Sequence, residues 1–287
     1  MIFVVLWATG FVVARLSAGH VAPVWFLALR FPLAALFMLG LALAQRARWP
    51  DAKGALHASV AGALLHALYL APIYWAVANG LPGGVSALFV GLQPFFTAFI
   101  AAAMVGERVT KWHWLGIFVG ITGVALVLAP KLTFTLLGGI TPLTAGLCVF
   151  AVLAAALGSV YQKKYAGTVP LSSGGFWQYV GASFVVLVIS VALGDYQFDS
   201  SPQAWIALGW AVLVLSIVAI LLLMVMIREG EVSRVSGWLF LEPGLAALMT
   251  YVLFNETLSP VQLLGMAVCA GSVLLINGPS AKQSAAR

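Results

Sequence analysis

Charged residues are scarce in this sequence, because Asp, Glu, Lys and Arg together make up only 8% of its 287 residues. Soluble globular domains carry roughly 25% charged residues, so the scarcity excludes a soluble globular protein of this length. Hydrophobic residues make up 63% instead, and long apolar runs recur from end to end. A run of about 20 apolar residues is the length that a helix needs to cross a membrane. We therefore expect an all-α polytopic membrane protein in contact with the lipid bilayer.

Cysteine is also scarce, and the two present, Cys148 and Cys269, both lie inside apolar runs. No paired spacing of metal ligands exists, so we expect no disulfide, metal or other cofactor. The net charge of +6 could suggest nucleic acid. In a membrane protein, however, positive residues mark cytoplasmic loops, so no nucleic-acid partner is expected. The start, "MIFVVLWATGFVVARLSAGH", lacks a positive residue before its apolar run and a small-x-small cleavage site, which favours a first span over a signal peptide.

Apolar runs between polar or Gly/Pro breaks predict ten transmembrane helices. Their expected bounds are Ile2–Leu16, Pro23–Ala44, Ala55–Ala78, Leu81–Val105, Trp112–Ala129, Pro142–Tyr161, Gly174–Leu193, Ala204–Ile227, Ser236–Phe254 and Val261–Ile276.

The placement of positive charge predicts the orientation of these spans. With a cytoplasmic N-terminus, Arg15 and Lys131 fall in outside loops and Arg30 falls within a span. All the other Lys and Arg residues fall on the inside, where an excess of positive charge is typical. These are Arg46, Arg48, Lys53, Arg108, Lys111, Lys163, Lys164, Arg228, Arg234, Lys282 and Arg287. We expect both termini to be cytoplasmic.

The chain also contains an internal repeat. With an offset of 149 residues, "GLQPFFTAFIAAAMVGERVTKWHWLGIFVGITGVALVLAP" aligns with "FLEPGLAALMTYVLFNETLSPVQLLGMAVCAGSVLLINGP". Gln93–Pro94 then meets Glu242–Pro243, and Glu107 meets Glu256. Each half holds five spans, an odd number, so the halves would insert with opposite orientation. Such repeats are a signature of secondary transporters. We expect two inverted five-helix repeats, residues 1–130 and 131–287, around a central cavity.

Three stretches resemble EamA-type members of the drug/metabolite transporter superfamily: "LQPFFTAF…GERVT…WLGIFVGITGVALVL", its partner "LEPGLAALM…NETLSPVQLLGMAV", and "ALRFPLAALF". The resemblance covers nearly the whole chain and implies a multi-pass inner-membrane exporter of small metabolites. More narrowly, the sequence resembles bacterial exporters of the YddG type, which release aromatic amino acids. Asn255 departs from the family pattern, which has glycine before the glutamate, as Gly106 is in the first half.

The pairs Gln93–Pro94 and Glu242–Pro243 are candidates for the binding site. Proline removes a backbone hydrogen bond from a helix, and lipid tolerates such a break only where protein or a wet cavity covers it. Pro94 and Pro243 are therefore expected to kink their helices and to act as hinges. A carboxylate within the membrane is costly, so Glu242 binds a substrate ammonium group, carries a proton, or is hydrogen-bonded to the loosened backbone.

Arg30 binds an anionic group or anchors the second helix. Glu107 and Glu256 suit helix capping or loop anchoring.

Aromatic residues deep in the spans complete the predicted substrate site, which comprises Trp7, His66, Tyr69, Tyr74, Gln93, Trp238 and Glu242. Rings at span ends are normally interfacial, whereas Trp7, Tyr69, Tyr74 and Trp238 lie deeper. His66 gates, shuttles a proton, or bonds Tyr69 or a backbone carbonyl. An apolar cavity with amphipathic rings and one carboxylate suits an amino acid with an aromatic or aliphatic side chain.

The sequence therefore predicts a monomeric secondary transporter, not an enzyme, that exports aromatic or hydrophobic amino acids by alternating access. An exporter of drugs or other metabolites with the same fold is one alternative. A phosphate-ester or nucleotide-sugar exchanger is another, but it would need several Lys or Arg residues at its cavity. A serine protease of the membrane would need a serine in a glycine turn with a histidine partner, which "RVSGW" and "GASFV" do not provide. A passive channel is distinguished only by experiment.

Overall fold

The computed structural model describes residues 2–131, 140–254 and 257–278, and this part of the chain is helical apart from its connections. Nine of its helical segments are long and apolar enough to cross a membrane. The apolar helix α1 (Ile2–Ser17) is shorter, with 16 residues. The all-α polytopic prediction is confirmed, whereas ten crossings, inverted halves and cytoplasmic termini stay predictions.

The remaining helices follow the predicted spans closely, and five of the segments consist of one regular helix. These are α2 (Pro23–Ala44), α7 (Lys111–Leu128), α8 (Pro142–Ala166), α9 (Leu171–Leu193) and α14 (Pro260–Asn277). The other four change helix type or break along their length. They are α3–η1–α4 (Ala52–Gly62, Ala63–Ala67, Leu68–Ala78), α5–α6 (Gly83–Val90, Gln93–Val105), α10–η4–α11 (Pro202–Trp210, Ala211–Ala219, Ile220–Glu229) and α12–η5–α13 (Val232–Gly237, Trp238–Leu241, Glu242–Phe254).

Side-chain caps explain where several helices begin. Asp51 accepts a hydrogen bond from the Gly54 amide at the start of α3, with an N–O distance of 2.8 Å. Ser259 and Gln262 form a reciprocal capping box at the start of α14. A capping side chain satisfies amide groups that the first turn leaves without partners. Proline in the first turn of α2, α8, α10 and α14 fits for the same reason, since it lacks the amide hydrogen.

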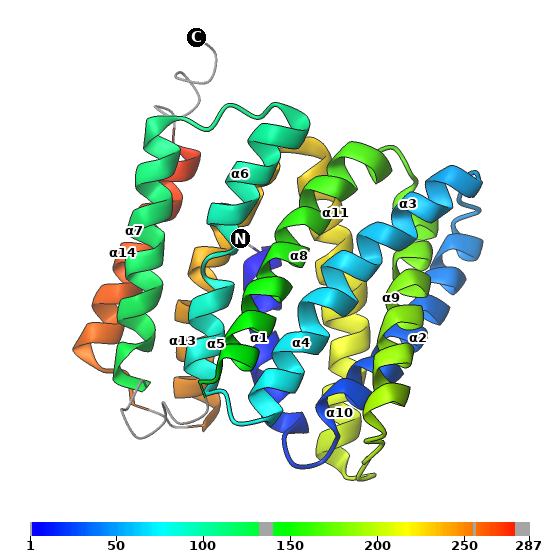
Figure 1. Cartoon of the computed structure of the whole chain (residues 1–287), viewed down its shortest axis with the longest axis horizontal. Helices are drawn as coiled ribbons and strands as arrows, with labels where there is room; N and C mark the ends of the chain where they lie inside the picture. The colour runs from blue at the N-terminus through cyan, green and yellow to red at the C-terminus, as the bar shows by residue number, and fades with distance from the viewer. Residues whose placement is uncertain (1, 132–139, 255–256, 279–287) are drawn as a thin grey trace.

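Helices from the two halves of the sequence pack side by side. Figure 1 shows α7 and α14 together at one edge and α2 with α9 toward the other, and both pairs are in extensive contact. Glycine permits the approach of α7 to α14, because a Cβ atom at Gly123 would lie 2.8 Å from the Cys269 amide nitrogen. At Gly265 it would lie 2.6 Å from the Val127 amide nitrogen. Small residues at such contacts are typical of helix packing in membranes.

Helix boundaries recur along the chain with the offset of the sequence repeat. Adding 149 to the bounds of α6 and α7 gives the bounds of α13 and α14. The two π-helical segments, η1 and η4, begin at Ala63 and Ala211, within one residue of that offset. The repeat seen in the sequence therefore extends to irregular features of the backbone.

The two spans that carry Pro94 and Pro243 are both interrupted just before these prolines. Gln93 begins α6 and Pro94 lies in its first turn, after a break at Gly91–Leu92. Pro243 is the second residue of α13, after the 3₁₀ segment η5. The expected interruption of each span therefore takes the form of a break just before the proline, which lies in the first turn of a new helix, where its missing amide hydrogen costs nothing. The proline inside α2 is Pro32, and the one inside α4 is Pro72.

Candidate functional site

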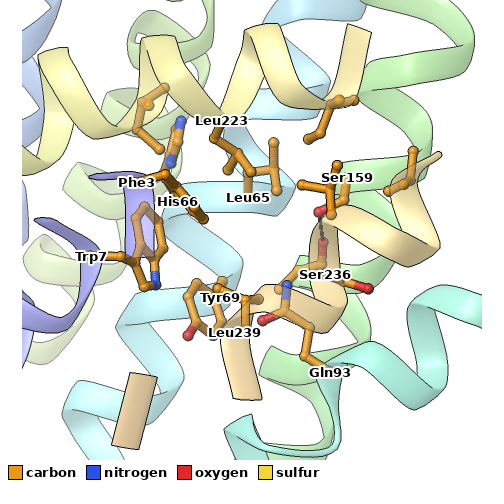
Figure 2. A pocket seen from close by; sticks show the side chains of 15 residues that line it. Phe3, Trp7, Leu65, His66, Tyr69, Gln93, Ser159, Leu223, Ser236 and Leu239 are labelled. Carbon is orange, nitrogen blue, oxygen red and sulfur yellow. Dashed lines mark hydrogen bonds between the residues drawn. The ribbon is translucent and has the colours of Figure 1, made fainter. Parts of the chain in front are cut away.

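A cavity lies inside the bundle, between segments from both halves of the sequence. Fifteen residues line it, from α1, η1, α4, α6, α8, α11, α12 and η5. Figure 2 shows Phe3, Trp7 and His66 on one side, with Tyr69 and Gln93 at another. Ten of the lining residues are apolar and none is Asp, Glu, Lys or Arg. The polar ones are His66, Tyr69, Gln93, Ser159 and Ser236. The wall thus combines a mostly apolar lining with uncharged hydrogen-bonding groups.

Some of these polar groups have no partner in the protein. Tyr69 and Gln93 are buried residues, and neither side chain makes a hydrogen bond with any residue that the structure describes. Ser159 and Ser236 instead donate to their own backbones, to Ala155 O and Ser233 O, each at 2.9 Å. Because Tyr69 and Gln93 line the cavity and their polar groups have no partner in the described residues, these two are the groups best placed to bind a ligand.

The structure brings four of the seven predicted site residues together at this cavity: Trp7, His66, Tyr69 and Gln93. The other three lie outside its wall. Tyr74 packs against the apolar core around α2 and α9, and Trp238 packs against the clusters that contain Phe240 and Phe3. Assignment of these two to substrate binding stays a prediction.

Glu242 is buried, with 7% of its surface exposed, and it is the first residue of α13. Within the described ranges it makes no hydrogen bond or salt bridge. It does interact electrostatically with Tyr69, which lines the cavity. The carboxylate therefore lies near the cavity without forming part of its wall.

His66 has a partner that the sequence did not suggest. Its Nε2 lies 3.2 Å from Oε1 of Gln178 on α9, and Gln178 in turn bonds Gln162 on α8. All three side chains are buried. Their sequence separations are too large for any local pattern to pair them. The available signal was that Gln178 is a polar residue within an apolar span.

Arg30 serves as an anchor within the bundle. Its Nε donates a hydrogen bond of 2.8 Å to Oγ of Ser216, in the π segment η4. The Tyr179 hydroxyl donates to the backbone oxygen of the same residue at 2.7 Å. Arg30 does not line the cavity. Of the two roles considered for Arg30, the geometry favours anchoring the second helix.

Glu107 joins the two halves at one end of the cavity. It follows α6, and its carboxylate accepts hydrogen bonds from the Val232 and Ser233 amides and from the Ser233 hydroxyl, at 2.6, 3.0 and 2.6 Å. Lys163 Nζ of α8 lies 3.9 Å from it. The capping role predicted for Glu107 is confirmed, and the helix that it caps, α12, lines the cavity. Glu256, its partner in the repeat, lies outside the described residues, as does Asn255.

The cations are placed unfavourably for a phosphate-ester carrier. Lys53 and Lys164 line a separate, open hollow where α3 begins and α8 ends. A carrier of multiply charged anions would direct such groups at its cargo. The cavity offers only neutral hydrogen-bonding groups, which argues against this alternative.

The EamA-like transporter family model matches residues 1–129 and 143–278 of the chain. The uncharacterized inner membrane transporter YedA of Escherichia coli K12 is 26% identical, over 95% of this chain and 87% of its own. The uncharacterized transporter YvbV of Bacillus subtilis is 23% identical, over 99% and 92% respectively. The chloroplastic WAT1-related protein At3g02690 of Arabidopsis thaliana is 25% identical, over 95% of this chain and 67% of its own.

A solved crystal structure of another protein has the same fold, with a TM-score of 0.81 at 18% identity. The match covers 98% of this chain and 96% of the other. The names of the relatives give no substrate, and they do not show the narrower resemblance to YddG-type exporters. The names agree with the helical architecture and the internal cavity in indicating a membrane transporter. The chain belongs to the EamA-like transporter family and is a multi-pass transporter of the inner membrane.

Proposed function

We propose that this transporter exports small amphipathic metabolites, and that aromatic and hydrophobic amino acids are its cargo. The observation that carries the proposal is the composition of the cavity wall, in which Phe3, Trp7 and Leu223 offer apolar contact while Tyr69 and Gln93 offer unpartnered polar groups. Large apolar area with a few placed polar groups is typical of small-molecule sites. An aromatic side chain fits the first part of this wall and an amino-acid backbone the second.

Glu242 supplies an acidic group near the polar end of the cavity. An ammonium group beside Tyr69 would be attracted by the carboxylate that interacts with that hydroxyl. Attraction between opposite charges is strong where water is largely excluded. Glu242 therefore recognises the ammonium group of the cargo without touching its apolar part.

Transport proceeds by alternating access within a single chain of two inverted five-helix units, residues 1–130 and 131–287. The recurrence of helix boundaries at the offset of 149 supports this division. Carriers of this kind rock one unit against the other around a central site. The breaks before Pro94 and Pro243 interrupt both of the spans that carry Gln93 and Glu242, and we assign the hinges to them.

Counterflow in proteoliposomes tests the cargo. Purified protein is reconstituted with unlabelled tryptophan, lysine or a phosphate ester inside, and uptake of labelled phenylalanine is followed against protein-free vesicles. Saturable uptake driven by tryptophan, and by neither of the others, is expected, because the cavity has apolar contacts and no cation. Saturable counterflow also distinguishes a carrier from a passive channel.

Absence of phenylalanine uptake in vesicles shown to be sealed would overturn the amino-acid assignment. Uptake driven by the phosphate ester would overturn it as well and would favour an exchanger of anions. Neither result would affect membership of the family, which rests on the sequence match.

A further inference from the structure

A chain of three buried side chains connects the cavity with the interior of the bundle. His66 of η1 lines the cavity, Gln178 of α9 lies behind it, and Gln162 of α8 lies behind Gln178. Their exposed fractions are 3%, 0% and 2%. The two glutamines do not line the cavity, so they reach a bound molecule only through His66.

The direction of these hydrogen bonds determines which His66 nitrogen carries the proton. Gln178 donates from Nε2 to Oε1 of Gln162 at 2.8 Å, so its own Oε1 is the atom that faces His66. A carboxamide oxygen only accepts hydrogen bonds. The His66 Nε2, 3.2 Å from that oxygen, must then be the donor. A neutral imidazole has one donor and one acceptor nitrogen, which leaves Nδ1 as an acceptor.

Ring contacts hold the imidazole in this orientation. His66 stacks on Tyr179, with centroids 4.8 Å apart and planes 11° apart, and its ring lies 6.1 Å from that of Phe31. Tyr179 is itself fixed by its hydrogen bond to Ser216. His66 Nδ1 has no hydrogen-bond partner in the described part of the chain, and the residue lies in the cavity wall beside Trp7 and Phe3 (Figure 2).

The charge near His66 determines whether a charged or an uncharged donor can bind to Nδ1. The Arg30 guanidinium interacts electrostatically with His66 and repels a second cation there. Glu242 acts instead on Tyr69. An ammonium group is therefore favoured toward Tyr69, and an uncharged N–H or O–H toward His66.

We propose that Gln162 and Gln178 are positioning residues that hold His66 as its Nε2–H tautomer, so that Nδ1 accepts a hydrogen bond from an uncharged N–H or O–H on the side chain of the cargo. The part of this proposal that concerns the cargo rests on the proposed function. It predicts that aromatic compounds with an N–H or O–H donor on the side chain, such as an indole or a phenol, are preferred to aromatic compounds without one. The positioning role concerns the protein alone and is tested without cargo.

The first test is ¹⁵N NMR of protein labelled at histidine and reconstituted in lipid. The chain has four histidines, and His66→Asn identifies the His66 signals by their loss. We expect the shift pattern of a neutral ring protonated at Nε2. Gln178→Leu is expected to lose that single tautomer, whereas Gln203→Leu, the same change at an exposed site on α10, keeps it. A ring protonated at Nδ1, or an unchanged tautomer in a folded Gln178→Leu protein, would overturn the positioning role.

The second test compares tryptophan with 1-methyltryptophan as competitors of labelled phenylalanine in counterflow. Wild type is expected to bind tryptophan about fivefold more tightly, roughly the effect of one neutral hydrogen bond. In His66→Asn, the side-chain oxygen can occupy the place of Nδ1, so this variant should keep most of the preference for tryptophan. In His66→Gln, the side-chain amide reaches the place of Nε2 instead, so this variant should lose the preference. If tryptophan and 1-methyltryptophan competed equally in wild type, the hydrogen bond from the cargo to His66 would be overturned, while the NMR result would stand. Absence of any amino-acid counterflow would instead contradict the proposed function.

Discussion

The two interrupted spans, α5–α6 and α12–η5–α13, have matching boundaries and different surroundings. Glu107 holds the N-terminus of α12, whereas no described side chain caps the N-terminus of α5. The α12–η5 segment supplies four residues of the cavity wall, and α5–α6 supplies only Gln93. The carboxylate that holds α12 thus comes from the other half, and its counterpart in the repeat, Glu256, lies outside the described residues. The difference that the structure describes is the contribution to the cavity wall, which is larger from α12–η5 than from α5–α6.

The largest expected effect comes from removing the Glu107 contact. Glu107→Ala leaves the amides of Val232 and Ser233 without their carboxylate, and hydrogen bonds to charged groups are worth about 1.5–3 kcal/mol each. We expect the α12 end of the cavity to open. A cysteine at Ser159, in a background with Cys148 and Cys269 replaced by alanine, should react faster with an impermeant maleimide added on the side of the α6–α7 connection.

Asp51→Ala is the matched control for this change. It also removes a carboxylate cap, but one that joins Asp51 only to Gly54 of its own helix. Labelling at position 159 should stay as in the parent protein. Equal labelling rates in Glu107→Ala and the parent would show that Glu107 caps a helix without holding the halves together.

The next effect compares glycines at equivalent positions of α7 and α14. A Cβ atom at Gly265 would lie 2.6 Å from a backbone nitrogen, whereas at Gly116 the nearest atom, also at 2.6 Å, belongs to the side chain of Ile276. Gly265→Ala forces the helices apart and should cost about 1–3 kcal/mol, and Gly116→Ala should cost less. Gly271→Ala on α14 meets nothing within 4 Å and should stabilise slightly. Melting in detergent checks the order, which a Gly265→Ala protein as stable as Gly271→Ala would contradict.

Much of this architecture could be predicted from the sequence, because span length and polar boundaries are local signals. Asp51 and Ser259 precede the helices that they cap, and Glu107, which was predicted to cap a helix or anchor a loop, does cap one. The prediction failed where backbone geometry departs from a regular helix. No local pattern predicts the π segments, and Pro94 predicted an interruption of its span but not that the helix breaks at Gly91–Leu92.

The candidate site was predicted only in part, for a related reason. Deep aromatic residues such as Trp7 and Tyr69 are conspicuous in apolar runs, and both reach the cavity. The chain from His66 through Gln178 to Gln162 depends on three helices meeting in space. Trp238 is one turn from Glu242 along a regular helix, but it lies in a 3₁₀ segment and packs into the core.

A smaller effect is expected where the halves differ in charge, at Gln93 and Glu242. Glu242→Gln should raise the half-saturation concentration for phenylalanine about tenfold, the equivalent of about 1.4 kcal/mol, because the ammonium group loses its attraction. A double variant that carries Gln93→Glu as well as Glu242→Gln has a carboxylate in the cavity wall instead. Its half-saturation concentration should return part of the way to the wild-type value. Counterflow measured over a range of phenylalanine concentrations gives the half-saturation concentration of each variant. A half-saturation unchanged in Glu242→Gln would assign the carboxylate a structural role.

The smallest effect concerns Arg30 and Tyr179, which occupy equivalent positions of the repeat and bond the same residue, Ser216. Tyr179→Phe removes one neutral hydrogen bond and keeps the ring that stacks on His66, so it should cost about 1 kcal/mol. Ser216→Ala should cost more, because it leaves the buried guanidinium without its partner while the Tyr179 bond to the backbone remains. Melting of both variants in detergent gives the order. If Ser216→Ala were the milder change, Arg30 would not depend on this bond, and the anchoring of α2 would have to lie in its apolar contacts with α9.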